Sequence, residues 1–159
     1  MGNKGSSQTP EGPKAIVNRK ARHDYELLDD WEAGIALQGS EVKSVFLGRV
    51  NMTDAFCQIV KGELFVMNLD IEPYSHASAF QPERRRDRKL LLHKKEIEII
   101  QRKSQEKGLT IIPTKIYFNQ KGRVKVQVSL ARGRRQYDKR DKIEADNTRR
   151  EAQAARAMR

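Results

Sequence analysis

Apolar residues alternate with polar ones in parts of the chain, and this spacing predicts β-strands. The clearest run is 123–130, in which every even-numbered residue is Val or Leu. Residues 109–118 come before it, and the turn sequence 119–122 between the two predicts a hairpin. Because proline has no backbone N–H to donate, Pro113 predicts an edge or a bulge in the earlier strand.

Further strands are predicted closer to the N-terminus. Residues 55–60 and 64–69 flank Lys61-Gly62-Glu63, a three-residue turn with a central glycine that predicts a second hairpin. Two shorter strands are expected at 25–28 and 34–37, on either side of an acidic stretch. Regular structure is therefore expected to begin near residue 25.

Two segments have the spacing of helices. A short helix is predicted over 39–48, with Ser40 as its N-cap and Gly48 as its end. A longer helix is predicted over 88–107, ended by Gly108. The side chains expected on their buried faces are Val42, Val45, Phe46, Leu90, Leu91, Ile97 and Ile100.

About six short strands and two or three helices favour a mainly β fold, a small antiparallel OB-like barrel, because closure removes exposed strand edges. A split α+β sheet is the alternative. Residues 16–130 provide the single domain, which we expect to be monomeric, and 1–15 form a flexible arm. Residues 131–159 contain ten Lys or Arg but few large apolar residues, which predicts a basic tail that is disordered when free.

The net charge of +11 is shared by the two parts, +6 for residues 1–130 (22 minus 16) and +5 for the tail (10 minus 5). A polyanion such as nucleic acid is the expected partner. No apolar run approaches the roughly 18 residues that span a bilayer, so we expect no membrane contact. The first six residues fit a loose myristoylation pattern, for which a flexible leader is the simpler interpretation. The single Cys57 indicates a reducing compartment, the cytoplasm.

Two basic clusters are candidates for phosphate contacts. Residues 84–89 contain five cations at the expected start of the longer helix, where backbone N–H groups also favour anions. Residues 18–23 form a second cluster, which the fold would have to bring alongside the first for the two to clamp an RNA backbone. The alternative for each cluster is a solvated, solubilising surface.

Catalysis has little support in the sequence. His23, His76 and His93 share no metal-ligand spacing, so we expect no enzyme activity, metal or cofactor. The acidic residues Asp29, Asp30 and Glu32 keep open the alternative of a small metal-dependent ribonuclease. A generic ribosomal or tRNA-binding barrel protein is the other alternative.

The start of the tail combines cations with an aromatic ring. Gly133 gives the backbone freedom where the last strand ends, and Tyr137 lies among Arg and Lys residues. Rings stack on nucleobases while cations hold phosphates, so this segment is a second candidate RNA contact.

Four motifs together resemble the SmpB family, the SsrA-binding proteins of bacteria. They are NRKARHDY at 18–25, EAGIALQGSEVKS at 32–44, RKLLLHKKEI at 88–97 and YDKR at 137–140. The motifs occur in order over most of the chain, from about residue 16 to 150.

This resemblance implies a six-stranded OB-like barrel that binds the tRNA-like domain of transfer-messenger RNA (SsrA). The resemblance also implies that the protein and this RNA together enter stalled ribosomes for trans-translation, or ribosome rescue on nonstop messages. The protein itself is expected to catalyse nothing. The residues implied to meet the tRNA-like domain are Asn18, Lys20, Arg22, Glu32, Arg88, Lys89, Leu91 and His93.

The resemblance also implies that the tail enters the decoding centre of the small subunit and the empty message channel. The residues implied there are Gly133, Arg134, Arg135, Tyr137, Asp138, Lys139 and Arg140. Many family members have histidine where this chain has Tyr137, so stacking is kept but a titratable charge is lost.

Overall fold

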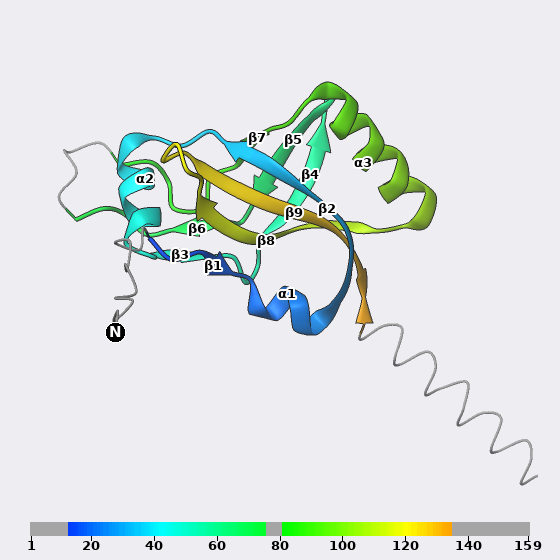
Figure 1. Cartoon of the computed structure of the whole chain (residues 1–159), viewed down its shortest axis with the longest axis horizontal. Coiled ribbons are helices and arrows are strands. Elements are labelled where there is room, and N and C mark those ends of the chain that lie inside the picture. The colour runs from blue at the N-terminus through cyan, green and yellow to red at the C-terminus, as the bar shows by residue number, and fades with distance from the viewer. Residues whose placement is uncertain (1–12, 76–80, 135–159) are drawn as a thin grey trace, which may run out of the picture.

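The computed structural model describes residues 13–75 and 81–134 of the chain, with nine strands and three α-helices in those ranges. Six strands form a closed antiparallel ring in the order β8, β4, β5, β7, β2, β9, because β9 pairs with β8 as well as β2 (Figure 1). Their bounds are β2 Tyr25–Ile35, β4 Phe56–Val60, β5 Glu63–Met67, β7 Arg88–Leu91, β8 Thr110–Phe118 and β9 Val124–Gly133. The ring confirms the predicted mainly β, six-stranded fold and not the split α+β alternative.

Short elements surround the ring. Strand β1 (Ile16–Val17) extends it beside β8, and β3 (Val50–Asn51) pairs with β6 (Asp70–Ile71). Figure 1 shows α2 and α3 at opposite ends of the ring, with α1 beside it. The helices are α1 Arg19–Asp24, α2 Gly39–Phe46 and α3 Lys94–Lys107. None of the helices in the described ranges is long and apolar enough to cross a membrane.

Both predicted hairpins are confirmed. Strands β4 and β5 join through the two-residue turn Lys61–Gly62, one residue shorter than predicted, where both residues have positive φ, 51° and 78°. This left-handed geometry matches the twist of a hairpin. The register between β8 and β9 shifts between Pro113 and Lys115, which confirms the bulge predicted from the proline.

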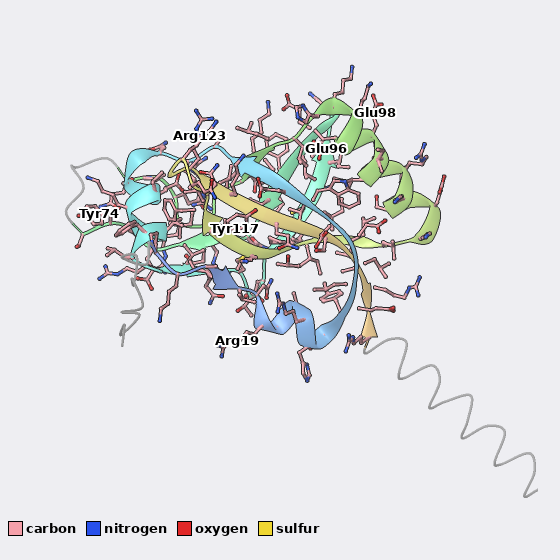
Figure 2. The ribbon with its side chains drawn as sticks, viewed as in Figure 1. Arg19, Tyr74, Glu96, Glu98, Tyr117 and Arg123 are labelled. Atoms are coloured by element: carbon pink, nitrogen blue, oxygen red, sulfur yellow. The ribbon has the colours of Figure 1, made fainter. Side chains whose placement is uncertain are left out.

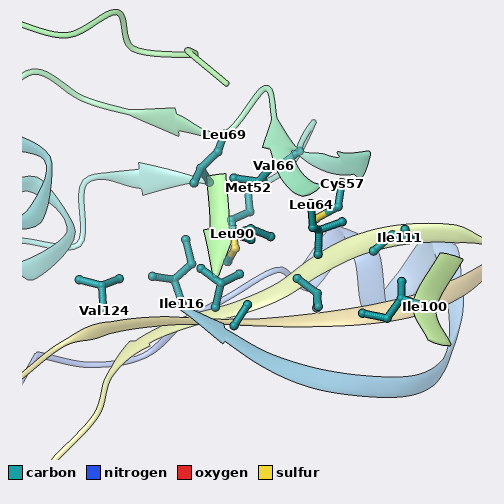
Figure 3. Close-up of a cluster of buried hydrophobic side chains, with 14 of the residues drawn as sticks. Met52, Cys57, Leu64, Val66, Leu69, Leu90, Ile100, Ile111, Ile116 and Val124 are labelled. Carbon is teal, nitrogen blue, oxygen red and sulfur yellow. The ribbon is translucent and has the colours of Figure 1, made fainter. Parts of the chain in front are cut away.

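The hydrophobic core fills the inside of the ring (Figure 3). The four alternating residues that the sequence assigned to one face of β9 are all buried, with relative exposures between 0% and 8%. Helix α3 closes one end of the ring by burying Ile97 and Ile100, as predicted. The inward residues that Figure 3 labels include Leu64, Leu69, Leu90, Ile111 and Ile116.

The prediction of one helix over 88–107 is wrong at its N-terminal end. Residues Arg88–Leu91 form strand β7, and α3 begins only at Lys94, although it does end before Gly108, which is left-handed at φ 60°. In β7, Arg88 and Leu90 point inward and Lys89 and Leu91 outward. The alternation was hidden in the sequence because one of its two inward residues is an arginine.

Three smaller predictions also differ from the structure. The two short strands expected around the acidic stretch are one continuous β2, with a register shift between Leu27 and Asp30. Helix α2 begins at Gly39 as expected, but its N-cap is Gln38 rather than Ser40, and Phe46 is exposed rather than buried. Strand β9 continues to Gly133, so the expected tail boundary at residue 131 falls inside a strand.

Arg88 is held inside the fold by Glu41 of α2. Its Nε atom donates to Glu41 Oε2 at 2.7 Å, and its guanidinium also donates to the backbone oxygens of Leu69 at 2.6 Å and Arg84 at 2.9 Å. Burial alone would raise the pKa of Glu41, but hydrogen bonds from Arg86, Gln38 and Arg88 outweigh it and lower that pKa. Glu41 therefore stays ionised at neutral pH.

Removal of Arg88 should destabilise the whole fold. Arg88→Met leaves Glu41 as a buried charge that has lost one of its partners, which costs about 3–5 kcal/mol in comparable cases. Urea unfolding followed by circular dichroism should show this loss. The control is Lys89→Met on the same strand, because Lys89 pairs with Glu63 at the surface and should cost about 1 kcal/mol or less. Equal losses in the two variants would contradict a structural role for the buried pair.

Candidate nucleic-acid interface

Strands β7, β2, β9 and β8 present a continuous outer face. Gly34 lies opposite Leu91 of β7 and Lys125 of β9, and Lys125 lies opposite Tyr117 of β8. Their neighbours along each strand are the core residues Leu90, Ala33, Val126 and Ile116, so these four positions point away from the core. A parallel row holds Glu32, Gln127 and Lys115. We call these seven residues the outer face.

A groove runs along one end of the outer face. It has a volume of about 510 Å³, and it forms where Gly34 lacks a side chain. A Cβ at this position would lie 3.2 Å from Leu91 Cβ, so glycine permits the close approach of Leu91, which is 53% exposed. Its apolar wall is lined by Ile35, Leu37, Val42 and Leu91, and its cationic rim by Arg123 and Lys125.

Tyr117 links the two rows of the outer face. Its hydroxyl donates a hydrogen bond to Glu32, and the Lys115 ammonium lies 5.2 Å from the centre of its ring. Burial, reinforced by the Glu32 carboxylate, raises the pKa of Tyr117 to about 12. Tyr117 is therefore a neutral, oriented ring, and Figure 2 shows it near the middle of the molecule.

The 84–89 cluster is only partly available to a ligand. Arg88 has no exposed surface, and Arg86 donates to Glu41 as well. Arg84 and Arg85 share Asp70, at 3.0 and 3.9 Å, and both stay about half exposed. Because the cluster runs into strand β7 and not into a helix, the predicted phosphate site at a helix N-terminus is wrong.

The 18–23 cluster lies on α1, a helix that the sequence analysis did not predict. The Asn18 side chain accepts from the Ala21 N–H at 3.1 Å, and it donates to the Met52 and Pro113 carbonyls at 3.2 and 2.9 Å. Asn18 is therefore a buried helix cap and an anchor. Lys20 and Arg22 are exposed, and Lys20 lies 3.8 Å from Asp54.

The two basic clusters flank the small β3–β6 sheet. Asn18 contacts the carbonyl of Met52, the residue that follows β3, and Asn51 in β3 pairs with Asp70 in β6. Asp70 in turn binds Arg84. The fold thus brings the clusters to neighbouring segments, with exposed cations on each.

The remaining predicted residues lie at the ends of elements. His93 is the exposed N-cap of α3, and its backbone N–H donates to Glu96 at 3.3 Å. Gly133 is the last residue of β9, paired with Tyr25, and Arg134 is exposed. The residues predicted in the tail that lie outside the described ranges are Arg135, Tyr137, Asp138, Lys139 and Arg140.

The acidic residues proposed for a ribonuclease do not converge. Asp29 binds Lys103 at 2.6 Å, Asp30 accepts from Gln127, and Glu32 accepts from Tyr117. Lys103 lowers the pKa of Asp29. Among residues 13–75 and 81–134, no group of three His, Cys, Asp or Glu side chains is placed to hold a metal ion.

The sequence analysis missed several residues of the outer face. Gly34, Lys115 and Tyr117 were not named as site residues, and Arg123 and Lys125 were read only as part of a strand. In the sequence, these residues occupy the outward positions of the same alternating patterns whose apolar positions predicted the core. That signal could not show which strands would be neighbours, because register across the ring decides which residues meet.

The closed ring and its cationic outer face are typical of small RNA-binding domains. The family model described as SmpB protein matches residues 15–159, and the chain belongs to this family. The SsrA-binding protein of Symbiobacterium thermophilum is 54% identical over 142 residues, 89% of each chain. That of Desulforamulus reducens is 48% identical over 150 residues, 94% of this chain and 92% of its own.

A solved structure has the same fold. It is described as "tmRNA-SmpB: a journey to the center of the bacterial ribosome", and its chain is 51% identical in sequence. The TM-score is 0.65, and the match covers 75% of this chain and 83% of the other.

The ionisation of Tyr117 tests the contact between the rows of the outer face. Tyrosinate absorbance in an alkaline titration, taken as the difference between the wild type and Tyr117→Phe, should show one group ionising near pH 12. Glu32→Gln removes the neighbouring negative charge and should bring this pKa closer to the ordinary value of 10.0, while burial keeps it somewhat raised. An unchanged titration in Glu32→Gln would contradict the contact.

Proposed function

We propose that this chain is a non-enzymatic adaptor that binds the tRNA-like domain of transfer-messenger RNA and delivers it to stalled ribosomes for trans-translation. Family membership supports this, as do the names of its relatives, SsrA-binding proteins, and the description of the structural neighbour. The observation that carries the proposal is the groove on the outer face, an apolar wall with a cationic rim. We expect the protein to act as a monomer in the cytoplasm, where ribosomes are.

The outer face offers three kinds of contact to a folded RNA. Lys125 and Arg123 neutralise phosphates at the rim of the groove, and Leu91 packs against a ribose or a base. The Glu32 carboxylate accepts hydrogen bonds, one of them from Tyr117, and an oxygen lone pair remains for a donor on a base edge. The exposed Lys20, Arg22, Arg84, Arg85 and Lys89 extend the cationic surface beyond the groove.

Two of the residues implied by the resemblance serve this interface indirectly. Asn18 fixes α1, and so the position of Lys20 and Arg22. Arg88 fixes β7 against α2, and so the position of Lys89 and Leu91. We propose that their role is to hold neighbouring contact residues in place.

The tail completes the proposed mechanism. Gly133 ends β9, and the following residues through Arg140 would enter the decoding centre and the empty message channel, with Tyr137 stacking on a base. In this mechanism the ring binds the tRNA-like domain, and the tail contacts the decoding centre and the message channel. Binding and delivery are therefore separable activities.

The contribution of the rim should be visible in the salt dependence of binding. Lys125→Ala should weaken binding of a tRNA-like-domain fragment and reduce the slope of log K against log salt by about 1, because one phosphate contact is lost. Filter binding at several salt concentrations measures both quantities. Lys107→Ala is the control, since Lys107 lies in the last turn of α3 at the other end of the ring. An equal change in slope for both variants would mean that only net charge matters.

Truncation separates binding from delivery, and the structure sets where to cut. Ending the chain after Arg134 keeps β9 intact, whereas a cut after Leu130 removes Ala131, which pairs with Leu27 and Thr110. The shortened protein should bind the RNA fragment within a few-fold of the full chain but should no longer support tagging on stalled ribosomes. Loss of fragment binding would contradict the division of labour.

A full-length variant with residues 135–159 scrambled at constant charge is the companion to this truncation. It should also lose tagging, because the proposed contact depends on where Tyr137 and its neighbours lie. Retained tagging would favour a generic ribosome-binding barrel with a basic tail.

A further inference from the structure

The end of α2 carries an apolar surface that the core does not use. Phe46 is 57% exposed and Leu47 is 51% exposed, although an amphipathic helix normally turns such residues inward. Phe46 meets Phe118 at the end of β8, with ring centres 6.0 Å apart and planes at 78°. The contact orients the ring of Phe46 without covering it.

Cationic residues lie on the chain segments that follow each ring of this aromatic pair. Arg49 is exposed three residues beyond Phe46, and its backbone N–H is fixed to the Ser44 carbonyl at 2.9 Å. On the other side, Lys121 and Arg123 follow Phe118 in the β8–β9 turn, which Figure 2 shows next to α2. The Asn119 side chain accepts from both of their backbone N–H groups, at 3.0 and 2.9 Å. The turn that carries these two cations is therefore ordered.

The surface formed by Phe46 and Phe118 is continuous with the groove of the outer face. Val42, one turn before Phe46 on α2, lines that groove together with Arg123 and Leu91. An RNA seated on the outer face would therefore extend directly over the end of α2.

We propose that Phe46, supported by Phe118, is a stacking platform for an unpaired nucleobase of the bound RNA, with Arg49, Lys121 and Arg123 holding the flanking phosphates. This inference rests on the proposed function and adds a subsite to it. Aromatic rings stack on any base, and flanking cations follow the backbone. The C-terminal end of a helix disfavours anions, so a base rather than a phosphate meets the ring itself.

Charge favours RNA over a second copy of this chain as the occupant. In a two-fold dimer the same surface meets itself, so the cations around one platform would face those around the other. Glu72 is the acidic residue in the backbone contacts beside the aromatic pair, where its N–H donates to the Arg49 carbonyl. Its single negative charge leaves this surface net positive.

Fluorescence and affinity together test the platform with full-length protein. The probe is the tRNA-like-domain fragment of transfer-messenger RNA carrying 2-aminopurine at single unpaired positions, whose emission is quenched on stacking. Wild type should quench at least one position. Phe46→Ala should abolish that quenching and weaken binding about 5- to 150-fold, the range expected for one base–aromatic stack. The salt slope should stay unchanged because no phosphate contact is lost.

Three further variants make the result specific. Phe46→Trp should keep quenching and affinity, whereas Phe46→Leu, apolar but without a stacking ring, should resemble Phe46→Ala. Ile99→Ala, at an exposed position on α3, should behave as wild type. Because Phe46 and Ile99 are both exposed, urea unfolding should give all four variants nearly wild-type stability.

The outcomes distinguish this inference from the proposed function. If wild type does not bind the fragment, the proposed function fails. If wild type binds but Phe46→Ala and Phe46→Leu bind and quench equally well, only the platform is overturned. A Phe46→Ala variant that changes the oligomeric state in sedimentation would also overturn it, in favour of self-association.

Discussion

The buried ion pair between Glu41 and Arg88 is the interaction on which the arrangement of the outer face and its groove depends. It joins α2 to β7, and the same guanidinium binds the carbonyls of Leu69 and Arg84 on the chain between them. A buried charge pair contributes less to stability than its Coulomb attraction suggests, but loss of either partner is costly. The pair holds α2 against β7, and in this arrangement Leu91 points outward beside Gly34 and Val42 of α2 lines the groove.

The same ion pair explains the main error in predicting the fold from the sequence. Alternation identified the strands of both hairpins, because their inward residues are apolar and their turns contain glycine. It failed in β7, where the inward position 88 is an arginine, and three successive leucines suggested a helix. It failed again in β2, where a run of exposed acidic residues made one strand look like two. In both strands, side-chain partners that are distant in the sequence allow charged residues to occupy strand positions.

The functional surface was predictable only in part. Glu32, Lys89 and Leu91 do lie on exposed positions of the ring, whereas Asn18 and Arg88 are buried and anchor their neighbours. Charge density alone overestimated the 84–89 cluster because it could not show that Glu41 and Asp70 hold four of its arginines. It missed Tyr117 and Lys125 because their relation to Gly34 depends on strand register. The local sequence shows where cations lie along the chain, but the fold decides which of them are available to a ligand.

The acidic stripe on β2 shows how a protein of net positive charge uses exposed carboxylates to position a sheet. Each one has a side-chain partner on another element: Arg132 of β9 for Glu26, Lys103 of α3 for Asp29, Gln127 of β9 for Asp30 and Tyr117 of β8 for Glu32. Exposed pairs of this kind add little stability individually. Together they favour one register of β2 against β9 and one position for α3, on both sides of the shift where β2 could otherwise slip. The carboxylates thus fix the sheet from which Lys125 and Leu91 project. Arg132 and Lys103 offset the charges of Glu26 and Asp29, whereas Asp30 and Glu32 keep their charge because their partners are neutral.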